Sequence, residues 1–453
     1  MATSASTTQL GQPHTIVIGG GWAGLTAAVK LAHHGCKVTL LESARQLGGR
    51  ARRVAFAQNR VDNGQHLLLG AYTETLEIMR FLGIRLDEKF LRHSLQLKLR
   101  DPKGKDVVLK APRLPAPLHL FIALLSCSGL SLKERLCAIQ FGFRLFMHGF
   151  ILPDDLPVQE LLLRYRQPES LIKKFWSPLC LAIMNTPADD ASAHVFIRVL
   201  HDSFRDDARF SDLLFARADL GSLLPDPAME YIEARQGSIK LGQKVTGLII
   251  EGDQIKGVQL DEQELMADHV ILATTANACH QLINGHRALR LLGSQLGQFT
   301  YEPICTIYLQ YPAEVTTGEH MVGLLGGHGQ WLFDRRIYKQ PGLMAVVISS
   351  AGPHMALDNN RLIKRIQCEL ATHYPDWPAP LDTMVIREKR ATFSCHAGIN
   401  QIRPECKTPV QGLWLAGDYT NTGYPATLEG AVRSGLECAR HITKTVPSPS
   451  KNQ

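Results

Sequence analysis

The stretch TIVIGGGWAGLTAAVKL, residues 15–31, decides the fold of this chain. Residues 15–18 are apolar or β-branched and predict a short buried strand. Residues 25–32 then have the alanine and leucine content of a helix. The turn between them carries three glycines in the pattern G-x-G-x-x-G, namely Gly19, Gly21 and Gly24. This order of strand, glycine turn and helix predicts an α/β domain that binds a dinucleotide.

The glycine turn indicates where a pyrophosphate would lie. Gly19 allows the tight turn, Gly21 lets the backbone approach the pyrophosphate, and Gly24 lets the helix pack closely on the strand. Trp22 and Ala23 stand at the start of the helix, where free N–H groups and the helix dipole favour anions. All five residues are expected cofactor contacts.

A second strand, CKVTLLE at 36–42, ends on an acid. Glu42 follows Gly24 at close to the usual spacing of about 20 residues. Its carboxylate can accept hydrogen bonds from a ribose diol and would repel a 2′-phosphate. The cofactor is therefore expected to be NAD or FAD.

The next turn, ARQLGGRARR at 44–53, favours FAD. Gly48 and Gly49 form a second flexible turn, with the cations Arg45 and Arg50 beside it. A G-G-R sequence after the ribose acid is typical of flavoproteins with two dinucleotide-binding motifs, and an NAD dehydrogenase has no need of it. Arg45, Gly49 and Arg50 are predicted FAD contacts.

The end of the chain contains a matching half of the site. In GLWLAGDYTNTGYPATLEG, residues 412–430, a short strand is followed by Gly417 and Asp418. A helix is predicted from 428, and its N-terminus at Thr427 and Leu428 would direct N–H groups at the flavin. The buried strand expected at 267–276 places Thr274 at the same edge.

This order of motifs resembles the FAD domain of the amine oxidase and phytoene desaturase superfamily. The resemblance implies that Asp418 lies near the ribityl chain or its phosphate. It also implies that Val245, at the start of a hairpin predicted over 245–260, lies against the adenine.

The chain has 453 residues, 45% of them hydrophobic, which suffices for two or three domains. We expect a mixed α/β fold in which 13–85, 225–290 and 405–445 form a discontinuous Rossmann-like FAD domain. The segments 86–224, mainly helical, and 291–404, with strands, would form an inserted substrate domain whose pocket faces the flavin.

The net charge and the cysteine content limit which binding partners, metals and cell compartment are expected. The net charge of +7 comes with no nucleic-acid motif, so a phosphate or an anionic membrane surface explains it better. The ten cysteines are scattered without metal-ligand spacing, so no metal is predicted and a reducing cytoplasm is expected. The ends, 1–12 and 446–453, are expected to be flexible tails.

Two apolar segments, 114–130 and 136–152, are too short to span a bilayer. They predict either an ordinary buried helical pair or a lipid-facing entrance that rests in one leaflet. The second interpretation would make the protein peripheral on the inner face of the membrane.

Three further stretches carry a closer resemblance: VDNGQHLLLGAYTETLEIMRFLGI at 61–84, FWSPLCLAIMNTP at 175–187 and TGYPATLEGAVRSG at 422–435. Together they resemble the squalene-associated FAD-dependent enzymes, the hydroxysqualene dehydroxylases, over nearly the whole chain. The resemblance implies reductive removal of the hydroxyl group of hydroxysqualene, a C30 isoprenoid lipid, to give squalene for hopanoid synthesis. Reduced flavin would deliver a hydride from N5 to an allylic cation, and an external reductant, NADPH or a reductase, would restore it.

The leaving hydroxyl needs an acid or a hydrogen-bond donor. His66 and Gln65, which follow Asn63 and Gly64 in the second flavin-contacting loop, are the first candidates. The loop could instead be structural, with Asn63-Gly64 making a turn and Asp62 capping a helix, or it could contact the isoalloxazine. Tyr424 could flank the flavin or stabilise the cation through its ring.

Three alternatives remain open at the sequence level. A carotenoid or squalene desaturase would use the same fold and move hydride to FAD. An amine oxidase would usually place two aromatic residues where Ala426 and Thr427 stand. A FAD-binding scaffold would hold lipid without turnover.

Overall fold

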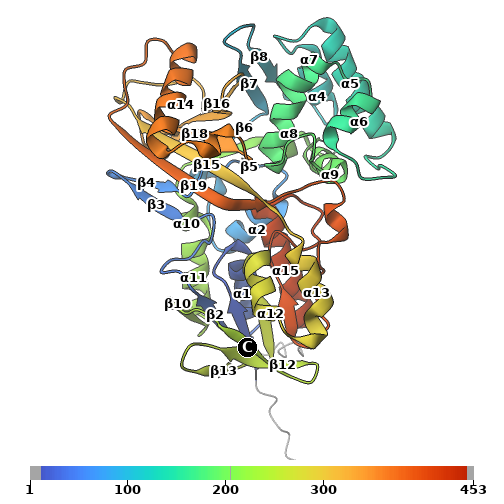
Figure 1. Cartoon of the computed structure of the whole chain (residues 1–453), viewed down its shortest axis with the longest axis vertical. Helices are drawn as coiled ribbons and strands as arrows, with labels where there is room; N and C mark the ends of the chain where they lie inside the picture. Colours follow the sequence, from blue (N-terminus) through green and yellow to red (C-terminus); the bar gives the residue numbers. More distant parts are fainter. Residues whose placement is uncertain (1–11, 205, 446–453) are drawn as a thin grey trace, which may run out of the picture.

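A five-stranded parallel sheet lies in the lower half of the molecule in Figure 1. The computed structural model describes residues 12–204 and 206–445. The central strand of this sheet pairs in parallel with a neighbour on each side. In spatial order the strands are β10 (Ser238–Leu241), β2 (Lys37–Glu42), β1 (His14–Ile18), β14 (His269–Leu272) and β20 (Leu413–Leu415). The predicted Rossmann-like sheet is confirmed. The predicted tails, apart from Gln12, lie outside the described residues.

Helices α1 (Trp22–His33) and α15 (Leu428–Thr445) pack against each other beside this sheet. Their approach depends on small residues, since a Cβ on Gly435 would stand 2.3 Å from the carbonyl oxygen of Ala23. A Cβ on Gly24 would stand 2.0 Å from the carbonyl oxygen of Gly19. The glycine pattern therefore fixes both the turn and the helix packing.

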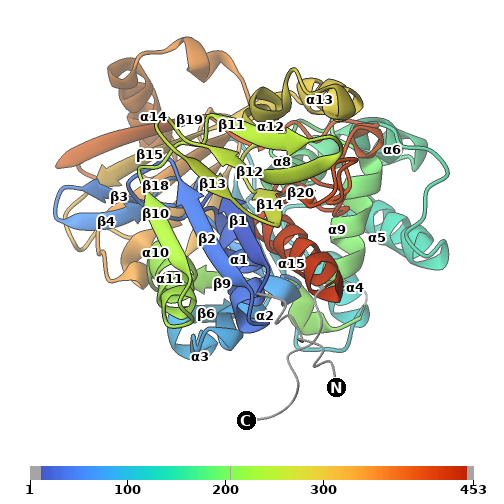
Figure 2. The same cartoon turned by 90° about the horizontal axis from the view of Figure 1, so that it is seen from below.

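Smaller elements surround the parallel sheet, and Figure 2 shows an antiparallel three-stranded sheet across it from α1. That sheet consists of β11 (Gly247–Glu251), β12 (Gln254–Gln259) and β13 (Glu264–Met266). The nearby helices are α2 (Thr73–Phe81), α3 (Leu86–Lys89), α10 (Leu220–Leu223), α11 (Pro225–Glu233), α12 (Ala276–Ile283) and α13 (Arg290–Gly297).

A seven-stranded sheet dominates the other half of the molecule. Its strands, in spatial order, are β19 (Asp382–Phe393), β15 (Tyr301–Gln310), β18 (Leu343–Ser349), β17 (Trp331–Asp334), β16 (Met321–Leu324), β7 (Gln96–Arg100) and β8 (Val107–Lys110). Helix α14 (Asn359–His373) packs on it. The strands β7 and β8 come from the segment 86–224, for which mainly helices are predicted. Their apolar residues alternate as in strands, β7 pairs with β16, and β8 pairs with β7.

The helical part of this half lies beside the sheet, at the upper right of Figure 1. It contains α4 (Leu118–Leu125), α5 (Leu132–Met147), α6 (Val158–Arg164), α7 (Glu169–Leu171), a π-helical turn (Ile172–Trp176), α8 (Ser177–Met184) and α9 (Ala193–Phe204). Helix α5 begins with a capping box in which Ser131 and Glu134 bind each other's backbone N–H groups. The two apolar segments of the sequence are thus α4 and α5.

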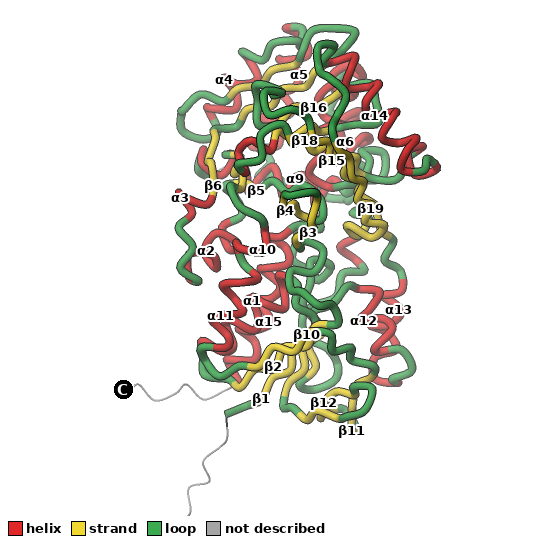
Figure 3. Tube along the Cα trace, turned by 90° about the vertical axis from the view of Figure 1, so that its left-hand side faces the viewer, coloured by secondary structure: helices red, strands yellow, loops and turns green. Residues whose placement is uncertain are grey.

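Two small sheets lie where the halves meet (Figure 3). One is the hairpin of β3 (Arg53–Phe56) and β4 (Asn59–Asp62), and the other joins β5 (Leu68–Leu69), β9 (Leu213–Ala216) and β6 (Phe90–His93). The segment between β4 and β5 therefore runs along the boundary, which positions residues 63–67 at the site.

Candidate active site

One continuous cavity of about 1370 Å³ runs from the glycine turn into the helical part of the other half. Pockets for one small ligand usually measure about 300–1,000 Å³, so this cavity has room for a dinucleotide and a second ligand. Its walls come from both halves of the molecule, from β1, β2 and α15 at one end and from α4, α5 and α8 at the other.

At the nucleotide end, the glycine turn has the shape that a pyrophosphate needs. A Cβ on Gly19, at φ +110°, would lie 2.5 Å from the carbonyl oxygen of Ala273, so only glycine fits. Gly21 has open space where its Cβ would stand. Trp22 and Ala23 line the cavity, and the indole Nε1–H of Trp22 is buried without a partner.

Glu42 is the last residue of β2 and lines the nucleotide end of the cavity. Its carboxylate accepts hydrogen bonds from the backbone N–H of Gly20 at 2.7 Å and of Ala44 at 2.7 Å. These bonds fix the carboxylate beside the glycine turn, and its remaining lone pairs can accept ribose hydroxyls. Val245 lies in the same wall.

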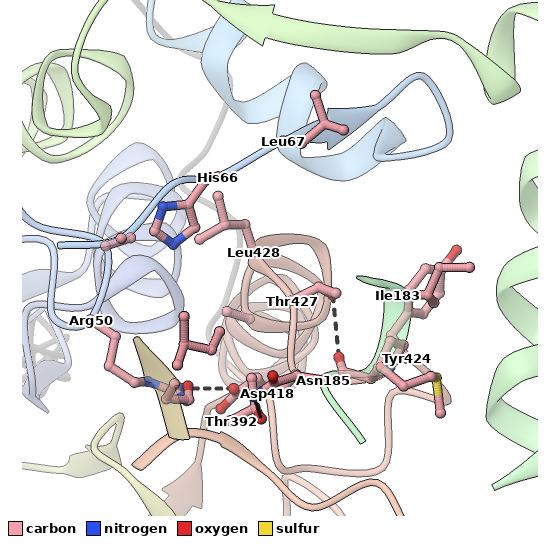
Figure 4. Close-up of a pocket in the computed structure, with 18 of the residues that line it drawn as sticks. Arg50, His66, Leu67, Ile183, Asn185, Thr392, Asp418, Tyr424, Thr427 and Leu428 are labelled. Atoms are coloured by element: carbon pink, nitrogen blue, oxygen red, sulfur yellow. Dashed lines mark hydrogen bonds and ion pairs between the residues drawn. The ribbon is translucent and has the colours of Figure 1, made fainter. Parts of the chain in front are cut away.

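The second turn brings a cation to the middle of the cavity. Gly49 has φ +59°, and a Cβ there would stand 3.2 Å from Gly21 Cα, so the two glycine turns touch. Arg50 donates to the carboxylate of Asp418 at 2.7 Å (Figure 4) and to the carbonyl of Ala391 at 2.7 Å. Arg45 is exposed at the cavity's edge.

Asp418 and its neighbours line the middle of the cavity. Gly417 precedes it at the end of β20, and Thr274 lies at the end of β14 in the same wall. At the start of α15, Leu428 lines the cavity, and Thr427 accepts a hydrogen bond from Gly430 N–H at 3.1 Å as a cap.

The loop after β4 carries the predicted catalytic residues. Asn63 donates to the carbonyl of Arg50 and to the carboxylate of Glu388, both at 3.1 Å. Gly64 has φ +100°, as a turn requires, and Asp62 accepts from Leu220 N–H at 2.9 Å at the start of α10. The structural role considered for Asp62 and the Asn63-Gly64 turn is therefore present, and the loop also lines the cavity.

Gln65 is held by a buried cation. Its Oε1 accepts from Arg335 at 2.5 Å, and its amide donates to the Tyr338 hydroxyl at 3.0 Å. The guanidinium of Arg335 also donates to Gln340 Oε1 at 2.7 Å and lies 3.9 Å from the centre of the Tyr338 ring. The polar atoms of Gln65 are thus engaged in anchoring the loop rather than free in the cavity.

His66 lines the cavity as a neutral ring. Burial lowers the pKa of its imidazole to about 4, although the nearby Gly64 backbone acts to raise it, and the Arg50 cation acts in the same direction as burial. Its Nδ1 is buried without a hydrogen-bond partner. His66 can therefore pair with a ligand near neutral pH, but it is not a reservoir of protons there.

Tyr424 lies across the cavity from this loop and is 2% exposed. Its hydroxyl donates to the carboxylate of Asp202 on α9. Burial works to raise the pKa of Asp202, but hydrogen bonds from Tyr424, His201 and Arg198 bring it below its usual range. The phenol hydroxyl is thus tied to an ionised acid, which leaves the ring of Tyr424 as the part that can line the cavity.

The far part of the cavity is lined mainly by apolar side chains. Helices α4 and α5 contribute Leu120, Phe121, Leu124, Ala138, Phe141, Gly142, Leu145 and Phe146, and the region of α8 contributes Phe175, Trp176, Leu179 and Ile183. Strands of the seven-stranded sheet contribute Ile304, Trp331, Phe333, Val347 and Ile386. Such a chamber suits a long hydrocarbon.

Comparisons with known proteins agree with this geometry. Residues 22–443 match the family described as flavin containing amine oxidoreductase. The chain belongs to this family. Hydroxysqualene dehydroxylase of Zymomonas mobilis is 27% identical over 94% of this chain and 98% of that protein. A 15-cis-phytoene desaturase of Glycine max is 24% identical over 96% of this chain and 80% of that protein.

The fold is also found among solved structures. The crystal structure of an oxidoreductase from Methanosarcina mazei superposes with a TM-score of 0.74 at 17% identity, covering 94% of this chain and 100% of that one. Membership of the flavin-containing family confirms the expectation of FAD. The open space at Gly21, the adjacent turn at Gly49 and the unpartnered Trp22 indole fit such a group.

Sequence reasoning missed several residues of this flavoprotein's site. Glu388 lines the cavity, and Arg335 and Asp202 bind the lining residues Gln65 and Tyr424. All three come from distant segments, and no local motif marks them. Arg403 is similar: it is 4% exposed, and its guanidinium donates to the carbonyl groups of Tyr424 at 2.7 Å and Asp418 at 2.9 Å. Only the fold brings these side chains to the cavity or to the residues that line it.

Proposed function

We propose that this flavoprotein reductively removes the hydroxyl group of hydroxysqualene to give squalene. The observation that supports the proposal most is the single cavity that joins the nucleotide cradle to a long apolar chamber. A lipid in the chamber would meet the flavin where the two parts join. The similarity to a hydroxysqualene dehydroxylase over nearly the whole chain points to the same substrate.

The proposed reaction breaks the allylic C–O bond, and the oxygen leaves with a proton as water. The carbon gains a hydride, which a reduced flavin can supply. Two electrons must then return to the cofactor from an external donor, NADPH or a separate reductase. The glycine-rich segment 324–331 joins the antiparallel strands β16 and β17, which is not the setting of a second dinucleotide site.

The chain's own residues would bind, orient and shield the substrate. The apolar walls exclude water from the carbon that loses its hydroxyl. We assign His66 to the hydroxyl as a neutral hydrogen-bond partner, Tyr424 to the cation through its ring, and Gln65 to positioning the loop. The FAD contacts predicted from the sequence are retained in this proposal.

An anaerobic reaction tests the function. Photoreduced protein is mixed with hydroxysqualene, and the extracted lipid is analysed by mass spectrometry. We expect squalene in amounts equal to the flavin reoxidised. Absence of squalene, with a more unsaturated product in an aerobic control, would instead support the desaturase, which the phytoene desaturase similarity keeps as the second candidate.

We also propose that the protein works peripherally on the inner face of a membrane. Within the described parts of the chain, no helix is long and apolar enough to cross a bilayer. However, exposed large apolar side chains gather on α4, α5 and the residues after α5: Leu118, Ile122, Leu125, Leu132, Leu136, Phe143, Phe146, Met147 and Ile151. We call this set the apolar lip. Other residues of α4 and α5 line the lipid chamber, and Phe146 belongs to both sets.

Charge points to an anionic bilayer as the surface that covers the apolar lip. Arg113, Lys133 and Arg144 are exposed in the same segment, and its acid, Glu134, is engaged with Ser131 and Ser170. Basic and apolar residues together bind anionic membranes through burial and charge attraction. A C30 lipid could then enter the chamber from the leaflet.

Vesicle flotation tests the membrane contact. We expect the protein to float with vesicles containing phosphatidylglycerol and less with phosphatidylcholine vesicles. The double variant Leu132→Ser/Phe143→Ser should lose most of this binding. Leu291→Ser/Leu381→Ser, which alters exposed apolar residues elsewhere, is the matched control. Equal flotation of both variants would contradict the proposed surface.

A further inference from the structure

Two polar atoms in the wall of the cavity are buried without a hydrogen-bond partner. They are Thr306 Oγ1 on β15 and Nδ1 of His66. Thr306 is 1% exposed, so no bulk water reaches it. A buried polar group without a partner is unfavourable, and in a ligand cavity it indicates a contact that the ligand completes.

The two groups flank the same point of the wall. Oγ1 of Thr306 lies 3.7 Å, and Cε1 of His66 lies 3.9 Å, from the position that a Cβ on Gly64 would occupy. They approach it from different elements, since Thr306 belongs to the seven-stranded sheet and His66 to the loop after β4. One small polar group could therefore contact both.

The surroundings of Thr306 are those of the lipid chamber. Across the sheet it pairs with Val347 on β18 and with Ile386 on β19, and both line the cavity. Ile304, two residues earlier on the same face of β15, lines it too. The hydroxyl of Thr306 is thus flanked by apolar side chains, while Ser349 and Glu388 are the polar residues farther along the same wall.

An alcohol matches this pair of groups. A hydroxyl donates one hydrogen bond and accepts others, and so does the hydroxyl of Thr306. A neutral imidazole presents either an N–H or a lone pair at Nδ1, according to its tautomer. Since the threonine can act in either sense, the pair offers the alcohol a donor and an acceptor with either tautomer.

We propose that Thr306 Oγ1 and His66 Nδ1 form a hydroxyl-binding subsite that holds the oxygen of the lipid alcohol. This inference rests on the proposed function and adds Thr306 to it. The subsite would orient the C–O bond within the junction of the cavity and let the protein prefer an alcohol to the corresponding hydrocarbon. A site built for a hydroxyl rejects an analogue that lacks it, because its polar groups are then left unpaired.

Binding to the oxidised holoenzyme tests the subsite without turnover. Hydroxysqualene and squalene are titrated separately, and their Kd values are read from changes in the visible flavin spectrum. For Thr306→Val, which keeps the β-branched shape, we expect the Kd of hydroxysqualene to rise about fivefold and that of squalene to stay unchanged. Thr306→Ser, which keeps the hydroxyl, should restore alcohol binding.

The outcomes separate the subsite from the overall function. Unchanged alcohol binding in Thr306→Val would overturn the proposal. A lower flavin content in this variant would overturn it too, because the Thr306 hydroxyl would then contact the cofactor. If the wild type bound the alcohol more tightly than squalene but formed no squalene from it when reduced, the reaction would be wrong while the subsite stood. Loss of alcohol preference in Thr306→Val, regained in Thr306→Ser, would support the subsite in either case.

Discussion

Arg335 is a fully buried cation whose nearest partners are amide oxygens and tyrosine rings. It is 0% exposed, and one of its guanidinium nitrogens, Nη2, has no hydrogen-bond partner. Burial raises the pKa of the nearby Asp62 carboxyl to about 6, although the Arg335 cation acts to lower it. The arrangement fixes Gln65, and with it the neighbouring His66, at the boundary of the two halves.

Replacing Arg335 should loosen this loop. In Arg335→Met, the acceptor oxygens of Gln65 and Gln340 lose their donor, so we expect a loss of about 1–3 kcal/mol in the free energy of unfolding. Squalene formation should fall about tenfold. Urea unfolding and turnover measure the two effects. Arg336→Met is the control, because Arg336 is exposed; an equal loss in both variants would contradict the anchoring role.

The low pKa of His66 gives a testable pH dependence. The pKa of His66 is about 4 in the folded protein, below the ordinary 6.5. The contribution of the neutral ring to the stability of the fold is therefore fully present above pH 6.5 and is lost as the pH falls toward 4. The ratio of wild-type to His66→Asn turnover should be constant from pH 6 to 8 and fall below about pH 5. A change in that ratio centred near pH 6.5 would show that the ring titrates normally.

Local motifs account for part of the site only. Glu42 and the first glycine turn could be predicted because strand, turn and acid lie close together in the sequence. Thr306 and Asp202 could not, since neither stands in a motif and each acquires its meaning from a partner on another element. His66 lay in a quoted motif, but its neutral state follows from burial.

At the scale of elements, α15 is fixed by a buried acid at its first turn. Glu429 is 0% exposed, and its carboxylate accepts from Thr75 N–H at 2.9 Å and Thr75 Oγ1 at 2.7 Å at the start of α2. It also pairs with Arg433 at 2.8 Å. One side chain therefore joins α2 to the helix whose N-terminus lines the cavity.

Weakening this joint should destabilise the fold. Glu429→Gln removes the charge that α2 and Arg433 share, so we expect the free energy of unfolding to fall by about 2 kcal/mol. Glu437→Gln, on the same helix but partly exposed beside His441, should change it by less than about 0.5 kcal/mol. Chemical denaturation of the holoprotein gives the free energy of unfolding of both variants. Similar losses in both would contradict the role of Glu429 in joining α2 to α15.

The elements differed in how well the sequence predicted them. The apolar composition of 114–130 and 136–152 predicts a helical pair, which is α4 and α5, but does not say which of their faces meets the chamber. The run QLKLR at 96–100 alternates as a strand does, yet its place in the seven-stranded sheet depends on β16, which lies far along the chain. Long-range pairing of this kind leaves no local signal.

At the scale of the molecule, a single cavity connects the two halves, and its two parts differ in chemistry. The nucleotide part carries glycine turns, arginines and carboxylates, and the other part is a chamber of leucine and aromatic side chains. The halves meet around the loop after β4 and the start of α15. A dinucleotide and a lipid would thus occupy different parts of one space and meet at this boundary, which predicts that the far part of the chamber can be altered alone.

Filling the chamber should stop the lipid reaction and leave the flavin in place. Gly142 lines the chamber on α5 and has open space where its Cβ would stand, so Gly142→Trp would occupy volume that the lipid needs. We expect squalene formation to fall at least about tenfold, with flavin content and visible spectrum unchanged. Gln140→Trp, exposed on the same helix and absent from the lining, should retain turnover. Loss of flavin in Gly142→Trp would mean that the cofactor reaches into the chamber, and full activity would place the lipid elsewhere.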